Sequence, residues 1–204
     1  MGREDADMQY VAQALYPMMQ AYDPFYIGAD ILQLGMDQRK AMILTREVAP
    51  KIDGSIRIAA MHHLLIGLQG SQRMGPAEAK MSKSVADSAV FIHDSREQIE
   101  SKINSAFCQP KIIEGNPILE IWKYIVFRKF KTRKIKRKDK PDLEVENYEE
   151  LEKAYREGNL HPADLKKETV EALDEILKPI RSYFEKNKKA KELYEIVKNA
   201  QITR

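Results

Sequence analysis

Residues 26–65 decide the fold of this chain, and they read YIGADILQLGMDQRKAMILTREVAPKIDGSIRIAAMHHLL. The apolar run from Tyr26 to Leu34 predicts a buried strand in a sheet that is covered on both faces. Residues 36–50 carry apolar side chains at helical spacing, and Pro50 ends the predicted helix. Residues 55–65 read as a second strand. Because a strand, a helix and a strand form one βαβ unit, we expect a parallel α/β sheet.

The chain on either side of this unit is predicted to be helical. Residues 8–19 have a helix-like composition, and Pro17 should stop or kink that helix. Later helices are expected over residues 95–107, from Pro117, from Asn147 to Gly158, from Pro162 past Pro179, and on to about Val197. The predicted fold class is therefore α/β plus α, with one domain over residues 1–92 and a mostly helical domain over residues 93–204.

The distribution of charge says more than its sum. The 204 residues carry a net charge of only +3. Within residues 128–140, however, nine of thirteen residues are Lys or Arg, and the stretch is predicted to form a strand or hairpin. Such a run favours an anionic partner, RNA before a membrane. A solvated strand edge protected by lysines explains the same run equally well.

The composition also argues against several classes of protein. Cys108 is the only cysteine, so an intrachain disulfide is impossible, and a reducing cytoplasm is the expected compartment. No metal-ligand spacing occurs in the sequence, and we expect no metal site. The polar, acidic start MGREDADMQY does not resemble a signal peptide, and no apolar run is long enough for a membrane span.

A loop over residues 67–84 contains the string Lys80-Met81-Ser82-Lys83-Ser84. Two ammonium groups and two hydroxyls on a loop after a strand could neutralise and hydrogen-bond phosphate. A polar surface loop explains the local chemistry about as well. The string resembles the KMSKS signature of class I aminoacyl-tRNA synthetases. The resemblance implies that the whole string binds ATP, that Mg²⁺ accompanies the nucleotide, and that the two lysines act on the pyrophosphate during catalysis.

A second string lies upstream, YPMMQAYD over residues 16–23. Tyr16 and Gln20 are four residues apart and can share a helix face, and Asp23 follows just beyond them. A phenol, an amide and a carboxylate in this arrangement could bind a small zwitterion with a polar tip. On the residues alone, an ordinary helix end in which Asp23 caps locally is the preferred interpretation.

This string resembles the YPxxQxxD segment of tyrosyl-tRNA synthetases of the archaeal and eukaryotic type. Residues 34–40, LGMDQRK, resemble that family's GGxxQRK segment, with Leu34 in place of its first glycine. The resemblance extends over nearly the whole chain. It implies the second half of a Rossmann-like nucleotide-binding domain, followed by an anticodon-binding domain. The implied activity is tyrosine–tRNA ligase, which joins L-tyrosine to tRNA(Tyr) at the expense of ATP.

The resemblance also implies a role for each matching residue of the tyrosine site. Tyr16, Gln20 and Gln38 would hold the ammonium group of the substrate. Asp23 would accept a hydrogen bond from the phenol of tyrosine, and Asp37 would contact the ribose of the adenylate.

The family's other signature, HIGH, has no counterpart in this sequence. None of the four histidines lies in such a string. One βαβ unit also supplies only two strands, fewer than a stable sheet usually needs. We therefore expect a C-terminal part of the enzyme, inactive without an N-terminal half that could come from a separate chain. A homodimer partner is a further possibility that the sequence leaves open.

The string Leu160-His161-Pro162-Ala163-Asp164-Leu165-Lys166 resembles the family's anticodon-binding surface. The resemblance implies that His161 and Asp164 contact the first anticodon base, with Asp139 at a position where some members stack an aromatic ring. On chemistry alone, the string is better explained as an ordinary helix start. His161 would cap the helix, with Pro162 in its first turn and Asp164 at its positive end.

Two alternatives to a tyrosine ligase remain open from the sequence. The absent HIGH string is compatible with a non-catalytic tRNA-binding module. A tryptophanyl-tRNA synthetase would share the fold and the KMSKS loop, although Asp23 in its context favours tyrosine.

Overall fold

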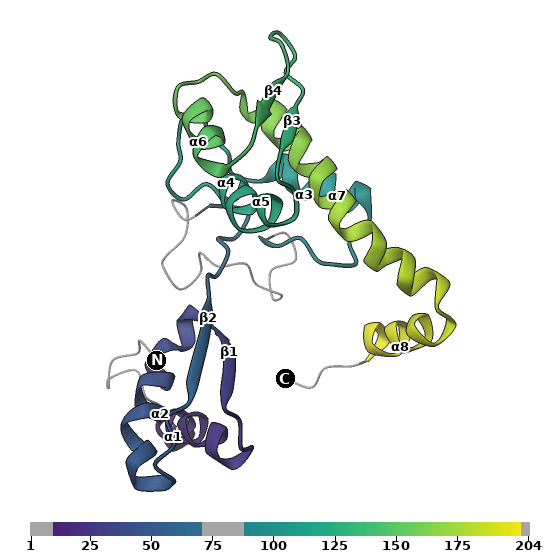
Figure 1. The fold of residues 1–204 in the computed structure, drawn as a ribbon. Coiled ribbons are helices and arrows are strands. Elements are labelled where there is room, and N and C mark those ends of the chain that lie inside the picture. The colour runs from purple at the N-terminus through teal and green to yellow at the C-terminus, as the bar shows by residue number, and fades with distance from the viewer. Residues whose placement is uncertain (1–9, 71–87, 201–204) are drawn as a thin grey trace. The chain divides into compact units, whose positions relative to one another are not determined.

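The computed structural model describes residues 10–70 and 88–200, and the chain divides into two compact units, Met1–Leu64 and Leu65–Arg204 (Figure 1). The predicted boundary after residue 92 falls inside the second unit. Leu68 explains the earlier start of that unit, because this side chain is 1% exposed in the second unit's core and its N–H donates to Ser88 O at 2.9 Å. A functional division at residue 92 stays a prediction, since residues 71–87 lie outside the described chain.

The first unit contains the predicted βαβ arrangement. Its elements in chain order are α1(Val11–Tyr26), β1(Ile31–Gly35), η2(Met36–Gln38), α2(Arg39–Ile52) and β2(Ile58–His62). β1 and β2 pair in parallel, with Ile31 opposite Ile58 and Gly35 opposite His62. The strand order and the parallel pairing expected from the sequence are therefore confirmed.

α1 is longer than predicted and takes residues that were assigned to the first strand. The helix continues through both of its prolines to Tyr26, so it does not stop at Pro17, and the predicted strand start at Tyr26 is wrong. The other expectation, a kink at Pro17, stays a prediction. Gly28, with a φ of +64°, ends the helical run. A proline removes one helical hydrogen bond. The packing of α1 on α2 offsets this loss, for example where Thr45 Oγ1 donates to Ala21 O at 3.1 Å.

The two strands bury one face of their sheet. Leu32 and Leu34 are half-buried, whereas Ile31 and Ile58 on the opposite face are 66% and 57% exposed. Within the described part of this unit the sheet is thus covered on one face, not on both as predicted. The reason is that two helices and two strands leave the second face without a covering layer.

The second unit is mostly helical and contains one short hairpin. Its helical segments are α3(Arg96–Ser105), α4(Pro117–Ile121), the π-helical turn η5(Trp122–Val126), α5(Phe127–Lys129), α6(Tyr148–Arg156), α7(Pro162–Lys186) and α8(Lys188–Asn199). β3(Arg133–Ile135) and β4(Leu143–Val145) pair antiparallel, as the basic stretch predicts. Figure 1 shows α7 as the long helix that passes the hairpin and ends near α8.

The core of the second unit forms around α4, η5, α6 and α7. Trp122 is fully buried, and its Nε1 donates to Thr169 Oγ1 at 2.8 Å, so Trp122 is a core residue. The predicted helix starts are also confirmed. Ser95 forms a capping box with Gln98 at the start of α3, and Asn147 caps α6. None of the helices in residues 10–70 and 88–200 is both long and apolar enough to cross a membrane.

Candidate functional site

The carboxyl end of β1 and the middle of α1 bring two predicted substrate residues together. Gln38 ends the short turn η2 that follows β1, and Gln20 lies on α1. Gln20 Nε2 donates to Gln38 Oε1 at 2.6 Å, although the two residues are 18 positions apart. In a parallel α/β sheet the carboxyl ends of the strands form the usual ligand-binding edge. The contact therefore lies where a small-molecule site is expected.

The other oxygen at this contact has no protein partner. Gln20 Oε1 is buried, and no donor within the described residues reaches it. A buried carbonyl oxygen without a hydrogen bond is costly, typically by about 1–3 kcal/mol. A ligand ammonium group has three donors and no acceptor, so it would satisfy this oxygen. The site thus has an acceptor suited to an amine.

Two further predicted residues lie on the same helix. Tyr16 is one turn before Gln20 and is 62% exposed, and Asp23 is exposed almost one turn after it. Residues four and three positions apart lie on adjacent parts of one helix face. The phenol, the amide and the carboxylate are thus available on α1. Within residues 10–64, the Asp23 side chain makes no capping hydrogen bond at the end of the helix.

Asp37 lies directly after β1, against Gly35. A Cβ added at Gly35 would come within 2.7 Å of Asp37 Oδ1 and 2.8 Å of Leu64 Cδ2. A larger residue at position 35 would therefore push the Asp37 carboxylate away. Leu34, which replaces the family's first glycine, is half-buried within β1 and pairs with Met61. The close approach of the backbone to Asp37 thus depends on Gly35, the second position of the family's glycine pair, and not on position 34.

Arg57 supports the opposite end of the sheet, at the amino ends of the two strands, and was not found from the sequence. Its side chain is buried, forms an ion pair with Asp53 at 2.6 Å, and lies 4.8 Å from the ring centre of Phe25. Arg57 thereby ties the start of β2 to the ends of α1 and α2. A single arginine between a turn and a strand carries no distinctive sequence signal, so only the structure reveals this role.

The predicted ATP-binding string, Lys80 to Ser84, lies outside the described residues, and its predicted role stays untested by the structure. Among the residues that are described, no group of three or more His, Cys, Asp or Glu side chains could hold a metal ion.

In the second unit, His161 and Asp164 lie in one hollow of about 490 Å³ beside the basic hairpin. Its other lining residues are Arg137, Lys138, Asp139, Lys140, Gly158, Asn159 and Ala163. Arg137 shapes this hollow, because its Nε donates to Pro141 O at 2.6 Å and its Nη1 donates to Asn159 O at 2.9 Å. Arg137 thus holds the hairpin loop against the segment before α7, and no local sequence pattern predicts that contact.

His161 caps α7 as its local chemistry predicts. Its Nδ1 accepts from Ala163 N at 3.1 Å, with Pro162 in the first turn. Because Nδ1 is the acceptor, the neutral imidazole carries its proton on Nε2, and this donor is available on an exposed side chain. Capping and ligand contact are therefore compatible at His161.

Comparison with known proteins identifies the family. The family described as "tRNA synthetases class I (W and Y)" matches residues 4–178. The chain belongs to this family.

Within this class I synthetase family, three similar proteins are tyrosine enzymes. The chain is 45% identical to the tyrosine–tRNA ligase of Saccharolobus solfataricus, over 100% of this chain and 59% of that protein. The tyrosyl-tRNA synthetase of Aeropyrum pernix superposes with a TM-score of 0.80 at 38% identity, covering 97% of this chain and 56% of that one. The tyrosyl-tRNA synthetase of Pyrococcus horikoshii, in a structure complexed with L-tyrosine, superposes with a TM-score of 0.80 at 40% identity. The match covers 95% of this chain and 58% of that one. This synthetase chain thus spans about three fifths of the length of such relatives.

Proposed function

We propose that this chain is part of a tyrosine–tRNA ligase, which activates L-tyrosine with ATP and transfers it to tRNA(Tyr). The observation that carries the proposal is the Gln20–Gln38 contact with its buried, unpartnered oxygen. An α-amino acid brings an ammonium group, which fits this acceptor. The first unit would then belong to a Rossmann-like nucleotide-binding domain, and the second would contain the anticodon-binding domain.

The residues around this contact take distinct roles in the proposal. Gln20, Gln38 and Tyr16 bind the ammonium group of tyrosine. Asp23 accepts a hydrogen bond from the phenol, and phenylalanine binds more weakly because it has no hydroxyl to donate to this carboxylate. Asp37, for which Gly35 leaves room, binds the ribose of the adenylate.

ATP is the second substrate in the proposal. Lys80 and Lys83 neutralise the charge that develops on the leaving pyrophosphate, with Met81, Ser82 and Ser84 completing the loop. Mg²⁺, when bound together with ATP, would supply further neutralisation of phosphate charge.

The chain covers 59% of the Saccharolobus solfataricus ligase, so the proposed reaction also needs groups from the part that is not matched. A direct test is a chimera in which residues 1–204 replace the matched part of that ligase. We expect tyrosine-dependent ATP–pyrophosphate exchange by the chimera. Lys80→Ala should reduce kcat, and Gln20→Ala should raise the KM for tyrosine about tenfold or more, because a charge-assisted hydrogen bond is lost. Unchanged exchange in both variants would contradict the proposal.

The second candidate function is a tRNA-binding module without catalysis. It is favoured by the hollow at His161 and Asp164, which lies within the compact second unit. Tight, salt-dependent binding of tRNA(Tyr) by the chain, together with a chimera inactive in exchange, would support this function over the ligase.

A further inference from the structure

A chain of five aromatic rings crosses the far end of α7. Phe91 stacks on His93 with ring centres 5.6 Å apart, and His93 lies 5.5 Å from Tyr194 of α8. Tyr194 meets Phe184 of α7 edge-on at 6.0 Å, and Phe184 meets Tyr183 at 5.7 Å. Three separate segments of the second unit thus contribute to one continuous aromatic surface.

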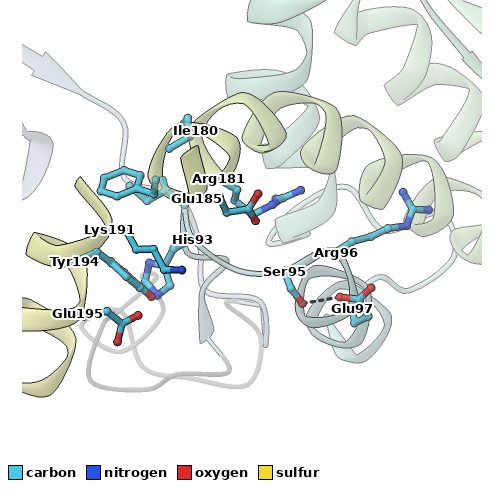
Figure 2. A pocket seen from close by; sticks show the side chains of 12 residues that line it. His93, Ser95, Arg96, Glu97, Ile180, Arg181, Glu185, Lys191, Tyr194 and Glu195 are labelled. Atoms are coloured by element: carbon cyan, nitrogen blue, oxygen red, sulfur yellow. Dashed lines mark hydrogen bonds between the residues drawn. The ribbon is translucent and has the colours of Figure 1, made fainter. Parts of the chain in front are cut away.

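This surface is open to solvent and hollowed. Tyr183 is 58% exposed and Phe184 is 37% exposed, and α8 buries none of its residues. A hollow of about 440 Å³ lies between α7, α8 and the start of α3, which is within the size range of small-molecule sites. Figure 2 shows His93, Lys191 and Tyr194 lying together at this hollow, with Arg96 away from them.

The charges in the hollow balance, whereas the surrounding segment is basic. The lining has three cations, Arg96, Arg181 and Lys191, and three carboxylates, Glu97, Glu185 and Glu195. Both arginines form ion pairs with acidic residues of α7. Residues 178–198, in contrast, contain seven Lys or Arg and three Glu.

Four lysines next to the hollow have no acidic partner in the described part of the chain. They are Lys186, Lys188, Lys189 and Lys191, at the turn from α7 into α8. Ammonium groups without carboxylate partners remain available to an anion.

We propose that this hollow binds an unpaired nucleotide of RNA, with its base against the aromatic surface and its phosphates at the lysines of the turn. Exposed rings interleaved with lysines are the usual means of binding single-stranded nucleic acid. A neutral aromatic hollow suits a base, and the unpaired lysines suit the backbone.

The inference rests on the proposed function, which supplies tRNA as the RNA. Along α7 the distance from Pro162 to Phe184 is about 33 Å at 1.5 Å per residue. The hollow is therefore separate from the one at His161, and one tRNA contacts both ends of α7. The nucleotide bound here lies outside the anticodon loop.

The test compares two RNAs, a complete tRNA(Tyr) transcript and its isolated anticodon stem-loop, by fluorescence anisotropy with the whole chain. Tyr194→Ala should weaken binding of the complete tRNA about tenfold, because base stacking is lost, and should leave binding of the stem-loop unchanged. Tyr194→Phe keeps a ring and should retain the affinity. Leu193→Ala is the matched control, since Leu193 is exposed on the same helix but does not line the hollow.

A second variant tests the backbone contacts. Replacing Lys186, Lys188 and Lys189 together by alanine should make the salt dependence of tRNA binding shallower by about two units of slope, again for the complete tRNA only.

Three results would overturn the inference. The first is equal loss for both RNAs in Tyr194→Ala with an unchanged melting temperature, which would mean that the Tyr194 ring contacts no nucleotide outside the anticodon stem-loop. The second is no loss for either RNA. The third is a change in sedimentation with unchanged RNA binding, which would make this face a protein contact. Failure of the proposed tRNA function is recognised separately, because the unmodified chain would then bind neither RNA.

Discussion

His161 occupies two roles at once, and substitution can separate them. Asparagine is a good helix cap but lacks the imidazole Nε2 donor. We expect His161→Asn to keep the melting temperature and to lose affinity for the anticodon stem-loop. His161→Ala should lose both, with about 1 kcal/mol less stability. Thermal melting and stem-loop binding of the two variants decide the matter. Full RNA affinity in His161→Asn would show that the residue is only a cap.

The ionisation of Cys108 and Tyr155 makes the free energy of unfolding depend on pH in the alkaline range. Burial raises the pKa of the Cys108 thiol above its ordinary value of 9.0, and burial likewise raises the pKa of Tyr155. Their Sγ and hydroxyl oxygen are 3.2 Å apart. Both groups hold their protons more tightly in the folded chain. The stability they contribute is therefore fully present below the pKa of the unfolded thiol, and it is lost as pH rises through the folded pKa values.

We therefore expect the free energy of unfolding to fall as pH rises above 9.0. Tyr155→Phe should cost about 1 kcal/mol at neutral pH, because the hydroxyl no longer donates to Gln109 O at 2.8 Å. The same variant should show a weaker dependence on alkaline pH. Denaturant unfolding at several pH values measures both effects, and an identical pH profile in the variant would refute this assignment.

Single residues also mark the limit of what the sequence could predict. The caps at Ser95, Asn147 and His161 depend on neighbours within three positions, so local patterns sufficed. The Gln20–Gln38 contact and the Arg137 bridges join residues 18 or more positions apart, apart from the bond to Pro141. Long-range contacts depend on how the elements pack, which local propensity does not encode.

At the scale of elements, the ion pair between β3 and α7 is the clearest case for a stability test. Arg133 contacts Glu168 at 2.7 Å, and their side chains are 15% and 13% exposed. Burial raises the pKa of Glu168 even with the arginine present. Arg133→Ala would leave this carboxylate buried without its cation.

We expect Arg133→Ala to destabilise the second unit by about 2 kcal/mol at neutral pH, below the full cost of a completely buried pair. The loss should shrink near pH 4, because Glu168 takes up a proton when its pKa is raised further. Thermal melting at both pH values provides the measurement. A loss that is equal at the two pH values would mean that the charge of Glu168 does not matter.

The elements themselves were partly predictable. The alternation of a strand, a helix and a strand gave the parallel pair β1–β2, and Pro162 gave the start of α7. The stop at Pro17 failed because tertiary packing of α1 outweighed a local penalty of one hydrogen bond. The prediction that the sheet is covered on both faces failed for the first unit, because strand composition alone does not say how many layers a unit contains.

At the scale of the whole molecule, the sequence motifs and the compact units give complementary information. The site in the first unit and the hollow at His161 in the second each bring together residues that the motifs single out. The aromatic surface at α8 had no motif, because its rings come from residues 91–93, α7 and α8. Proximity among three distant segments appears only in the folded chain.

The most direct test of the central claim is the amino-acid dependence of ATP–pyrophosphate exchange by the Saccharolobus solfataricus chimera, measured with tyrosine, tryptophan and phenylalanine. We predict exchange with tyrosine and little with the other two. Asp23→Ala should reduce the preference over phenylalanine, because the acceptor for the phenol is removed. Exchange driven by tryptophan, or a preference for tyrosine that does not depend on Asp23, would contradict the tyrosine site proposed on α1.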